Sequence, residues 1–268
     1  MGRTSQFDNL RKKRRRKRLF RRTVAAAVLA ALAAAAVFAV TVVYQLDLRS
    51  QLENYVASLR GGGGFPVALD GMTVHRLLPM GKDVAVVTSA GTYIYNSSGA
   101  RINSCLNNYR TPQARAAGGK ILTYDLGGTD LRVDNKAKQL HALTVKGGSL
   151  LAADIAQNGA IAVAQTGVGV DAMVLAYNPR FELMYGWSVQ DSYITDVALS
   201  PRGTRMSCAG ITMEGQHIVS LLRVHHFDQD QEVARVSLPD EVIVSMVWDG
   251  QEEIQVVTDK SLYLLDSP

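Results

Sequence analysis

Beyond residue 64 the apolar positions fall in short strand-like runs, and no helical period is visible. Five segments align on a turn glycine. A second apolar run follows the first in each segment, and a turn such as Ser97-Ser98-Gly99 leads on to a third. Gly, Asn and Asp favour tight turns because they tolerate positive φ at low cost. The pattern therefore predicts short antiparallel strands, of which the first after each glycine are Val84–Thr88, Ile121–Tyr124, Ile161–Gln165, Met206–Ala209 and Ile254–Thr258.

The aligned glycines return at a regular interval. Gly81, Gly119, Gly159, Gly203 and Gly250 are 38, 40, 44 and 47 residues apart. Four short strands recurring every 40 residues or so are typical of propeller blades, which stack because one blade cannot bury both of its apolar faces. We expect an all-β propeller of about five four-stranded blades over residues 65–268. A β-sandwich is the alternative, but it gives no reason for the glycine to return in register.

The fifth repeat ends at Leu265-Asp266-Ser267-Pro268, one strand short of the others. A propeller can close when the strand before its first blade completes the last one. The segment Phe65–Leu69 is the candidate for that strand. The alternative is an incomplete ring, and the sequence leaves both possibilities open.

A long uncharged segment precedes the repeats. The 22 residues from Thr23 to Tyr44 carry no charge. A helix of that length spans roughly 33 Å, against a hydrocarbon core of about 30 Å. We expect one transmembrane helix over residues 23–46. A cleaved signal peptide is the alternative, but its apolar stretch is normally shorter.

The charge is divided unequally between the two sides of this segment. Residues 1–22 contain 11 of the 29 Lys and Arg residues and one acid, Asp8, so they carry +10 and the remaining chain carries 18 − 23 = −5. Basic residues beside a span stay on the cytoplasmic side, where anionic lipid holds them. The adjoining apolar segment argues against a nucleic-acid-binding arm. We expect a cytoplasmic tail over residues 1–22, bound to the lipid bilayer, and a domain outside the cell membrane.

Residues 47–64 separate the apolar segment from the repeats. Leu48, Leu52, Tyr55 and Leu59 share one face of a helix, and the four glycines at 61–64 end it. This pattern predicts a short stalk helix and a glycine hinge. The apolar face either forms a weak homodimer with a second copy or rests on the domain or the lipid headgroups.

Three stretches carry a resemblance to a known family. Phe65-Pro66-Val67, the run Gly91–Gly99 and the run Tyr193–Pro201 resemble the family of unknown function DUF5711, and the likeness covers about residues 20–268. The resemblance implies a single-pass, propeller-like membrane protein of Gram-positive bacteria. It implies no activity and no catalytic residues.

Motifs that would indicate an enzyme or a cofactor are not found. The sequence has no nucleophile elbow, phosphate loop or dinucleotide fingerprint, so we expect no enzyme, cofactor or metal. The side chains of His225 and His226 would point to opposite faces of a strand, which favours a solvated approach to a turn over a metal site. Asp228-Gln229-Asp230 is interpreted as a polar turn. Cys105 and Cys208 are interpreted as buried and unreactive, with a bridge between them as the alternative.

Asp154 and Asp196 occupy similar places in their repeats, inside apolar strands. They either line a central channel or form structural hydrogen bonds to a neighbouring turn. The aromatic residues, Trp187 and Trp248 among them, form a ligand face or pack between blades, and core packing is favoured.

The function that these patterns favour is that of a membrane-anchored, extracytoplasmic module that binds an envelope protein or a wall polymer. The alternative is a receptor or enzyme for a small ligand at the centre of the ring, with Asp154 and Asp196 as the candidate site residues.

Overall fold

The computed structural model describes residues 33–34, 48–69 and 71–267 of the 268-residue chain. The predicted tail (1–22) and, apart from residues 33 and 34, the predicted transmembrane helix (23–46) lie outside the described residues. In the ranges that are described, no helix combines the length and the apolar character needed to cross a bilayer. The prediction of a membrane span therefore stays a prediction. Helix α2 (Leu48–Ser58) lies within the predicted stalk.

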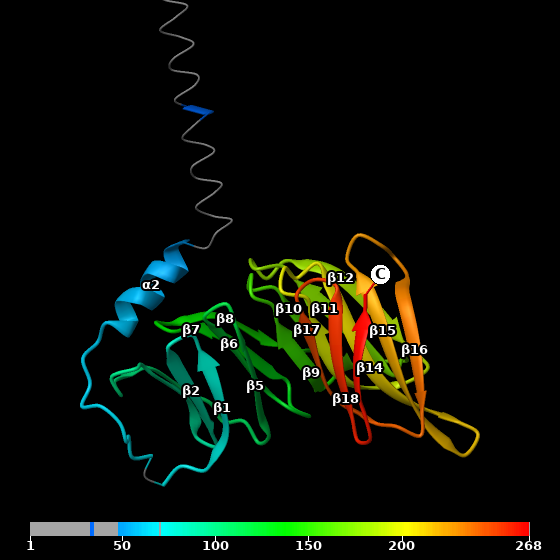
Figure 1. The fold of residues 1–268 in the computed structure, drawn as a ribbon, viewed down its shortest axis with the longest axis horizontal. Helices are drawn as coiled ribbons and strands as arrows, with labels where there is room; N and C mark the ends of the chain where they lie inside the picture. The colour runs from blue at the N-terminus through cyan, green and yellow to red at the C-terminus, as the bar shows by residue number, and fades with distance from the viewer. Residues whose placement is uncertain (1–32, 35–47, 70, 268) are drawn as a thin grey trace, which may run out of the picture. The chain divides into compact units, whose positions relative to one another are not determined.

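All strands belong to the unit Glu53–Pro268, and they form five antiparallel sheets in chain order, coloured from cyan to red in Figure 1. The first two sheets are built from β1 (Val74–Met80), β2 (Asp83–Thr88), β3 (Gly91–Tyr95) and β4 (Arg101–Leu106), and from β5 (Pro112–Ala117), β6 (Lys120–Asp125), β7 (Asp130–Asn135) and β8 (Gln139–Thr144).

The other three sheets follow the same order of strands along the chain. The third has β9 (Leu150–Ile155), β10 (Ile161–Thr166), β11 (Ala172–Tyr177) and β12 (Leu183–Val189). The fourth has β13 (Tyr193–Leu199), β14 (Arg205–Glu214), β15 (His217–His226) and β16 (Glu232–Pro239), and the fifth has β17 (Ile243–Asp249), β18 (Glu253–Thr258) and β19 (Leu262–Asp266).

The repeat predicted from the glycines is confirmed. Each aligned glycine lies between the first and second strands of its sheet, and their φ angles are 72°, 72°, 95°, 63° and 70° in chain order. The runs predicted to follow the glycines are the second strands, β2, β6, β10, β14 and β18. Four sheets have four strands and the fifth has three, so the last repeat is indeed one strand short.

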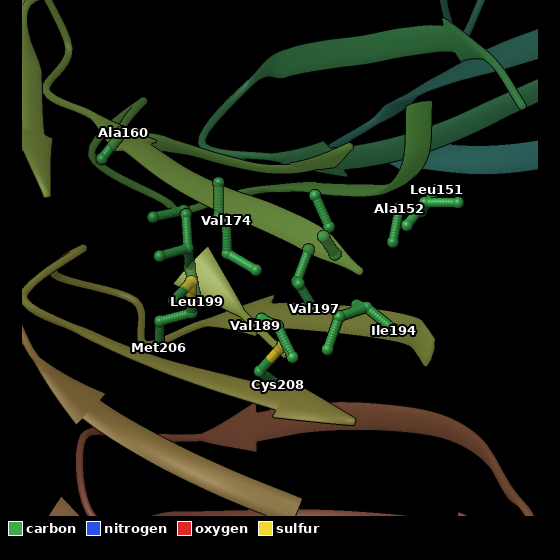
Figure 2. Close-up of a cluster of buried hydrophobic side chains, with 14 residues drawn as sticks. Leu151, Ala152, Ala160, Val174, Val189, Ile194, Val197, Leu199, Met206 and Cys208 are labelled. Atoms are coloured by element: carbon green, nitrogen blue, oxygen red, sulfur yellow. The ribbon is translucent and has the colours of Figure 1, made fainter. Parts of the chain in front are cut away.

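Apolar side chains fill the spaces between consecutive sheets, and the first strands β1, β5, β9, β13 and β17 pack against one another in succession. Figure 2 shows the core between the third and fourth sheets, where Val174 and Val189 meet Val197, Met206 and Cys208. Burial of both faces of the second, third and fourth sheets explains why their inner strands are continuous apolar runs rather than alternating ones.

On the other face of the first sheet, the described residues place a loop rather than another sheet. Val86, Tyr93 and Tyr95 pack there against side chains that include Val67 and Leu69. Of the two possibilities left open for the fifth repeat, the structure does not show completion by Phe65–Leu69, because this segment covers the apolar face of the first sheet. Among the described residues, β17 and β1 do not pack as neighbouring first strands do, so the five sheets form an open arc.

The second half of α2 is fixed to turns of the first two sheets. The Asn54 side chain accepts a hydrogen bond from Lys136 N at 2.8 Å and donates one to Gly119 O at 3.3 Å. Ser58 Oγ and Lys136 Nζ each contact Asp83 Oδ2 at 2.6 Å. This end of the stalk rests on the domain. The apolar side chain of Tyr55 remains exposed, and dimerisation through the stalk stays a prediction.

Candidate functional site

The inner strands of the second to fifth sheets line a cavity of about 270 Å³. Arg115 on β5 and Asp154 on β9 supply charged groups to its wall. Leu199 follows on β13, and Met246 and Trp248 lie on β17. Each of these strands is the first of its sheet, so the repeat itself brings these positions together around one centre.

Arg115 joins the two aspartates that the sequence singled out. Its Nη2 donates to Asp196 Oδ1 at 3.1 Å, and its Nε lies 4.0 Å from Asp154 Oδ1. The sequence reasoning did not identify Arg115. A signal was available, since Arg115 is a lone charge in an apolar inner strand, four residues before its turn glycine.

Both aspartates also accept hydrogen bonds from the backbone of the next sheet. Asp154 Oδ2 accepts from Leu199 N at 2.8 Å, and Asp196 Oδ2 accepts from Met246 N at 3.3 Å. Asp154 thus lines the cavity and links two sheets at once. At Asp154, therefore, lining a central channel and forming a structural hydrogen bond are not mutually exclusive.

Burial raises the pKa of Asp154 to about 6, although the hydrogen bond from Leu199 N and the charge of Arg115 act against this rise. Burial also raises the pKa of Asp196, again against the effect of Arg115. Burial by itself lowers the pKa of Arg115, but the two carboxylates outweigh it and the net shift is upward. Arg115 thus forms ion pairs with two carboxylates, of which only Asp154 belongs to the described lining of the cavity.

The fifth sheet presents an exposed apolar face. Its opposite face, with Trp248, Ile254 and Val256, packs on the fourth sheet. The strand register places the side chains of this face in two rows, Val247, Gln255 and Leu264 in one row and Ser245, Val257 and Leu262 in the other. Val247, Leu262 and Leu264 are more than half exposed, at 58%, 67% and 63%. Large exposed apolar patches on folded domains are typical of interaction sites for proteins, membranes or ligands.

The same sheet also has an unpaired edge. Thr258 N donates to Ser261 O at 2.9 Å, so these two residues form a hydrogen-bonded pair. Along an antiparallel ladder, hydrogen-bonded pairs of opposite residues alternate with pairs that are not hydrogen-bonded. Tyr263 and Leu265 therefore turn their backbone groups toward β18, whereas Leu262, Leu264 and Asp266 turn theirs outward. Within the described part of the chain no strand pairs with this side of β19.

The structure corrects one of the histidine interpretations. His225 is fully buried near the end of β15, and its Nδ1 lies 2.9 Å from the Tyr185 hydroxyl. The solvated position expected for His225 is wrong, because Tyr185 and Trp187 of the third sheet cover this end of the strand. Burial, assisted by the charge of Arg223 and opposed by that of Glu232, lowers the pKa of His225 to about 4.

The two cysteines are buried and unbridged, as the favoured interpretation had it. Burial raises the pKa of Cys105 to about 11 and that of Cys208 to about 12, so neither thiol is reactive. Among the described residues, no three His, Cys, Asp or Glu side chains lie close enough together to hold a metal ion.

The sequence model of DUF5711, a family of unknown function, matches residues 70–267. A comparison with curated proteins gave no match.

Solved structures with a similar fold include Hsv2p of Kluyveromyces lactis, at 15% identity and a TM-score of 0.53, covering 72% of this chain and 61% of that one. The Pan2 WD40 domain of Neurospora crassa has 14% identity, a TM-score of 0.53 and coverages of 72% and 61%. The hydrazine synthase of Kuenenia stuttgartiensis has 13% identity, a TM-score of 0.54 and coverages of 73% and 58%. The chain thus spans about six tenths of the length of these structures. At such identities the likeness concerns the propeller-like fold alone.

Proposed function

The chain belongs to the DUF5711 family, whose function is unknown, and we propose that it is a membrane-anchored module whose propeller binds a protein partner outside the cell. The anchor is the uncharged segment within residues 23–46, oriented by the ten excess positive charges of residues 1–22. The tail holds anionic lipid on the cytoplasmic side. The envelope of a Gram-positive cell is the setting that the family resemblance implies.

The observation that carries this proposal is the fifth sheet, with an exposed apolar face beside an edge that no described strand pairs with. An extended segment of another protein can add to such an edge, because the backbone supplies the hydrogen bonds and the alternate side chains supply the specificity. Lys260 precedes the edge strand β19, and Asp266 is the last residue of this strand. An antiparallel partner strand therefore fits best with apolar residues opposite Leu262 and Leu264 and a basic residue opposite Asp266.

Site-specific photo-cross-linking in native membranes tests the proposal. A photoreactive residue in place of Leu262 should capture one discrete partner, whereas the same residue in place of the exposed Arg180 should not. Leu264→Pro should abolish the capture, because it removes a backbone N–H that points outward and leaves the ladder to β18 intact. Equal capture from both positions, or capture that survives Leu264→Pro, would contradict the proposal.

The central cavity supports a second candidate, a receptor or enzyme for a small ligand, with Arg115 and Asp154 in contact with it. Complementation of a deletion strain distinguishes the small-ligand candidate from the main proposal of a protein partner. Under the main proposal Arg115→Met restores the wild-type phenotype and Leu264→Pro does not. The opposite pattern would make the cavity the functional site.

A further inference from the structure

A groove of about 660 Å³ lies between the third and fourth sheets, apart from the central cavity and from the fifth sheet. Its wall includes Trp187 and Asp191 on one side and Gln231, Glu232 and Arg235 on the other. The volume falls in the range of small-molecule sites. The groove is formed by the end of β12 and the loop that follows it, together with the loop before β16 and the start of β16.

The indole of Trp187 is held in place from within the protein. The His225 ring lies with its centroid 4.3 Å from that of Trp187, and the guanidinium carbon of Arg223 lies 5.4 Å from the indole centroid. His225 is itself fixed by the Tyr185 hydroxyl. Because these contacts are buried, Trp187 offers the groove an aromatic surface that loses little freedom on binding.

The carboxylates of the groove are fixed in a similar way. Arg223 has no exposed surface and donates to both oxygens of Asp191 at 2.7 Å. Arg235 Nε donates to Glu232 Oε1 at 2.7 Å. Each carboxylate oxygen can accept more than one hydrogen bond, so Asp191 and Glu232 keep acceptor capacity for a ligand.

The balance of groups indicates the class of ligand. Three acids, Asp191, Asp230 and Glu232, face two arginines, Arg223 and Arg235, so the local charge is 2 − 3 = −1 and favours no strongly charged ligand. Amide side chains add donors and acceptors around one aromatic ring. A sugar matches this set, since its C–H face packs on an aromatic ring and its hydroxyls both donate and accept.

We infer that the groove between the third and fourth sheets binds an oligosaccharide, with one sugar ring on Trp187 and hydroxyls on Asp191, Glu232 and Gln231. This inference goes beyond the proposed protein partner and does not depend on it, because the fifth sheet and the groove share no residues.

Intrinsic fluorescence tests this inference, because the chain has two tryptophans, Trp187 in the groove and Trp248 at the central cavity. The full chain in detergent is titrated to millimolar concentration with chitotetraose, cellotetraose and maltotetraose. In Trp248→Phe, at least one of these sugars should change the emission of Trp187 saturably. No saturable change with any of the three, or a change that persists in Trp187→Phe and disappears in Trp248→Phe, would overturn the inference.

A matched pair of glutamines controls the titration. Gln231→Ala should weaken binding roughly five- to tenfold, as expected for one lost hydrogen bond. Gln157→Ala, which alters the wall of the central cavity, should leave the affinity unchanged. Equal effects of the two substitutions would contradict the assignment to the groove. Thermal unfolding of each variant checks that the fold is retained.

Discussion

Arg223 and His225 lie two residues apart on the same strand, and both are fully buried, but their partners differ. Arg223 has two carboxylates beside it, Asp191 Oδ1 at 2.7 Å from its Nη2 and Glu232 Oε2 at 3.4 Å from its Nε. His225 has the Tyr185 hydroxyl as a neutral partner, and burial lowers its pKa to about 4. The first residue links β15 of the fourth sheet to the loop that follows β12 of the third, and the second makes the stability of the domain depend on pH.

Removal of Arg223 should destabilise the domain far more than removal of Arg235, although both contact Asp191 and Glu232. Arg223→Ala opens a buried site and deprives Asp191 of its bidentate partner, at an expected cost of roughly 2–4 kcal/mol. Arg235 is half exposed, so Arg235→Ala should cost less than about 1 kcal/mol. Urea denaturation of both variants measures the difference, and equal losses would contradict this account of Arg223.

Because of His225, the unfolding free energy of the domain should fall on acidification. Its pKa is about 4 in the folded state and 6.5 without the protein environment, so the unfolded chain binds more protons between these values. The unfolding free energy therefore falls as the pH drops from about 6.5 to 4, and the contribution is constant above that window. Melting temperatures across this range should fall less in His225→Leu than in the parent chain.

His217→Leu is the matched control, because His217 is mostly exposed. Its pH profile should follow that of the parent chain. If the melting temperature of His225→Leu falls on acidification as steeply as that of the parent chain, the acid sensitivity comes from other groups.

At the scale of elements, the repeat is built from the turn between the first and second strands of each sheet. The turn glycines adopt positive φ, where a side chain is strained, and this requirement is local enough to be visible in the sequence. Their surroundings differ, however. A Cβ on Gly203 would lie 2.7 Å from Ala160 Cβ, whereas one on Gly250 would meet nothing within 4 Å.

Alanine at the two positions should therefore have different effects. Gly250→Ala brings only the backbone strain, about 1–2 kcal/mol. Gly203→Ala adds a clash between the third and fourth sheets and should cost roughly 2–4 kcal/mol in total. Chemical denaturation measures both, and a larger loss at Gly250 would contradict the account.

Whether a feature depends on local signals or on contacts between repeats explains what the sequence could and could not predict. The strands β2, β6, β10, β14 and β18 were predicted because apolar runs and turn glycines are local signals. The place of Phe65–Leu69 was not, since it depends on which apolar face lies nearest once the sheets have formed. Arg115 and the groove at Trp187 were missed because their partners come from other repeats, Asp196 in one case and Glu232 in the other.

At the scale of the whole molecule, three surfaces have distinct chemistry. The fifth sheet offers an exposed apolar face, the groove at Trp187 offers polar groups around an aromatic ring, and the central cavity is lined by Arg115 and Asp154 together with apolar residues. The fixed end of α2 holds the domain to the stalk through Asn54 and Ser58.

The central claim, a propeller held outside the cell membrane, is tested most directly by labelling Arg180→Cys with a membrane-impermeant maleimide in intact cells. Arg180 is exposed, and the parent chain is the control because its two thiols are buried. We predict labelling of the variant in intact cells and none of the parent. Labelling of the variant only after lysis would place the domain inside the cell and contradict the account.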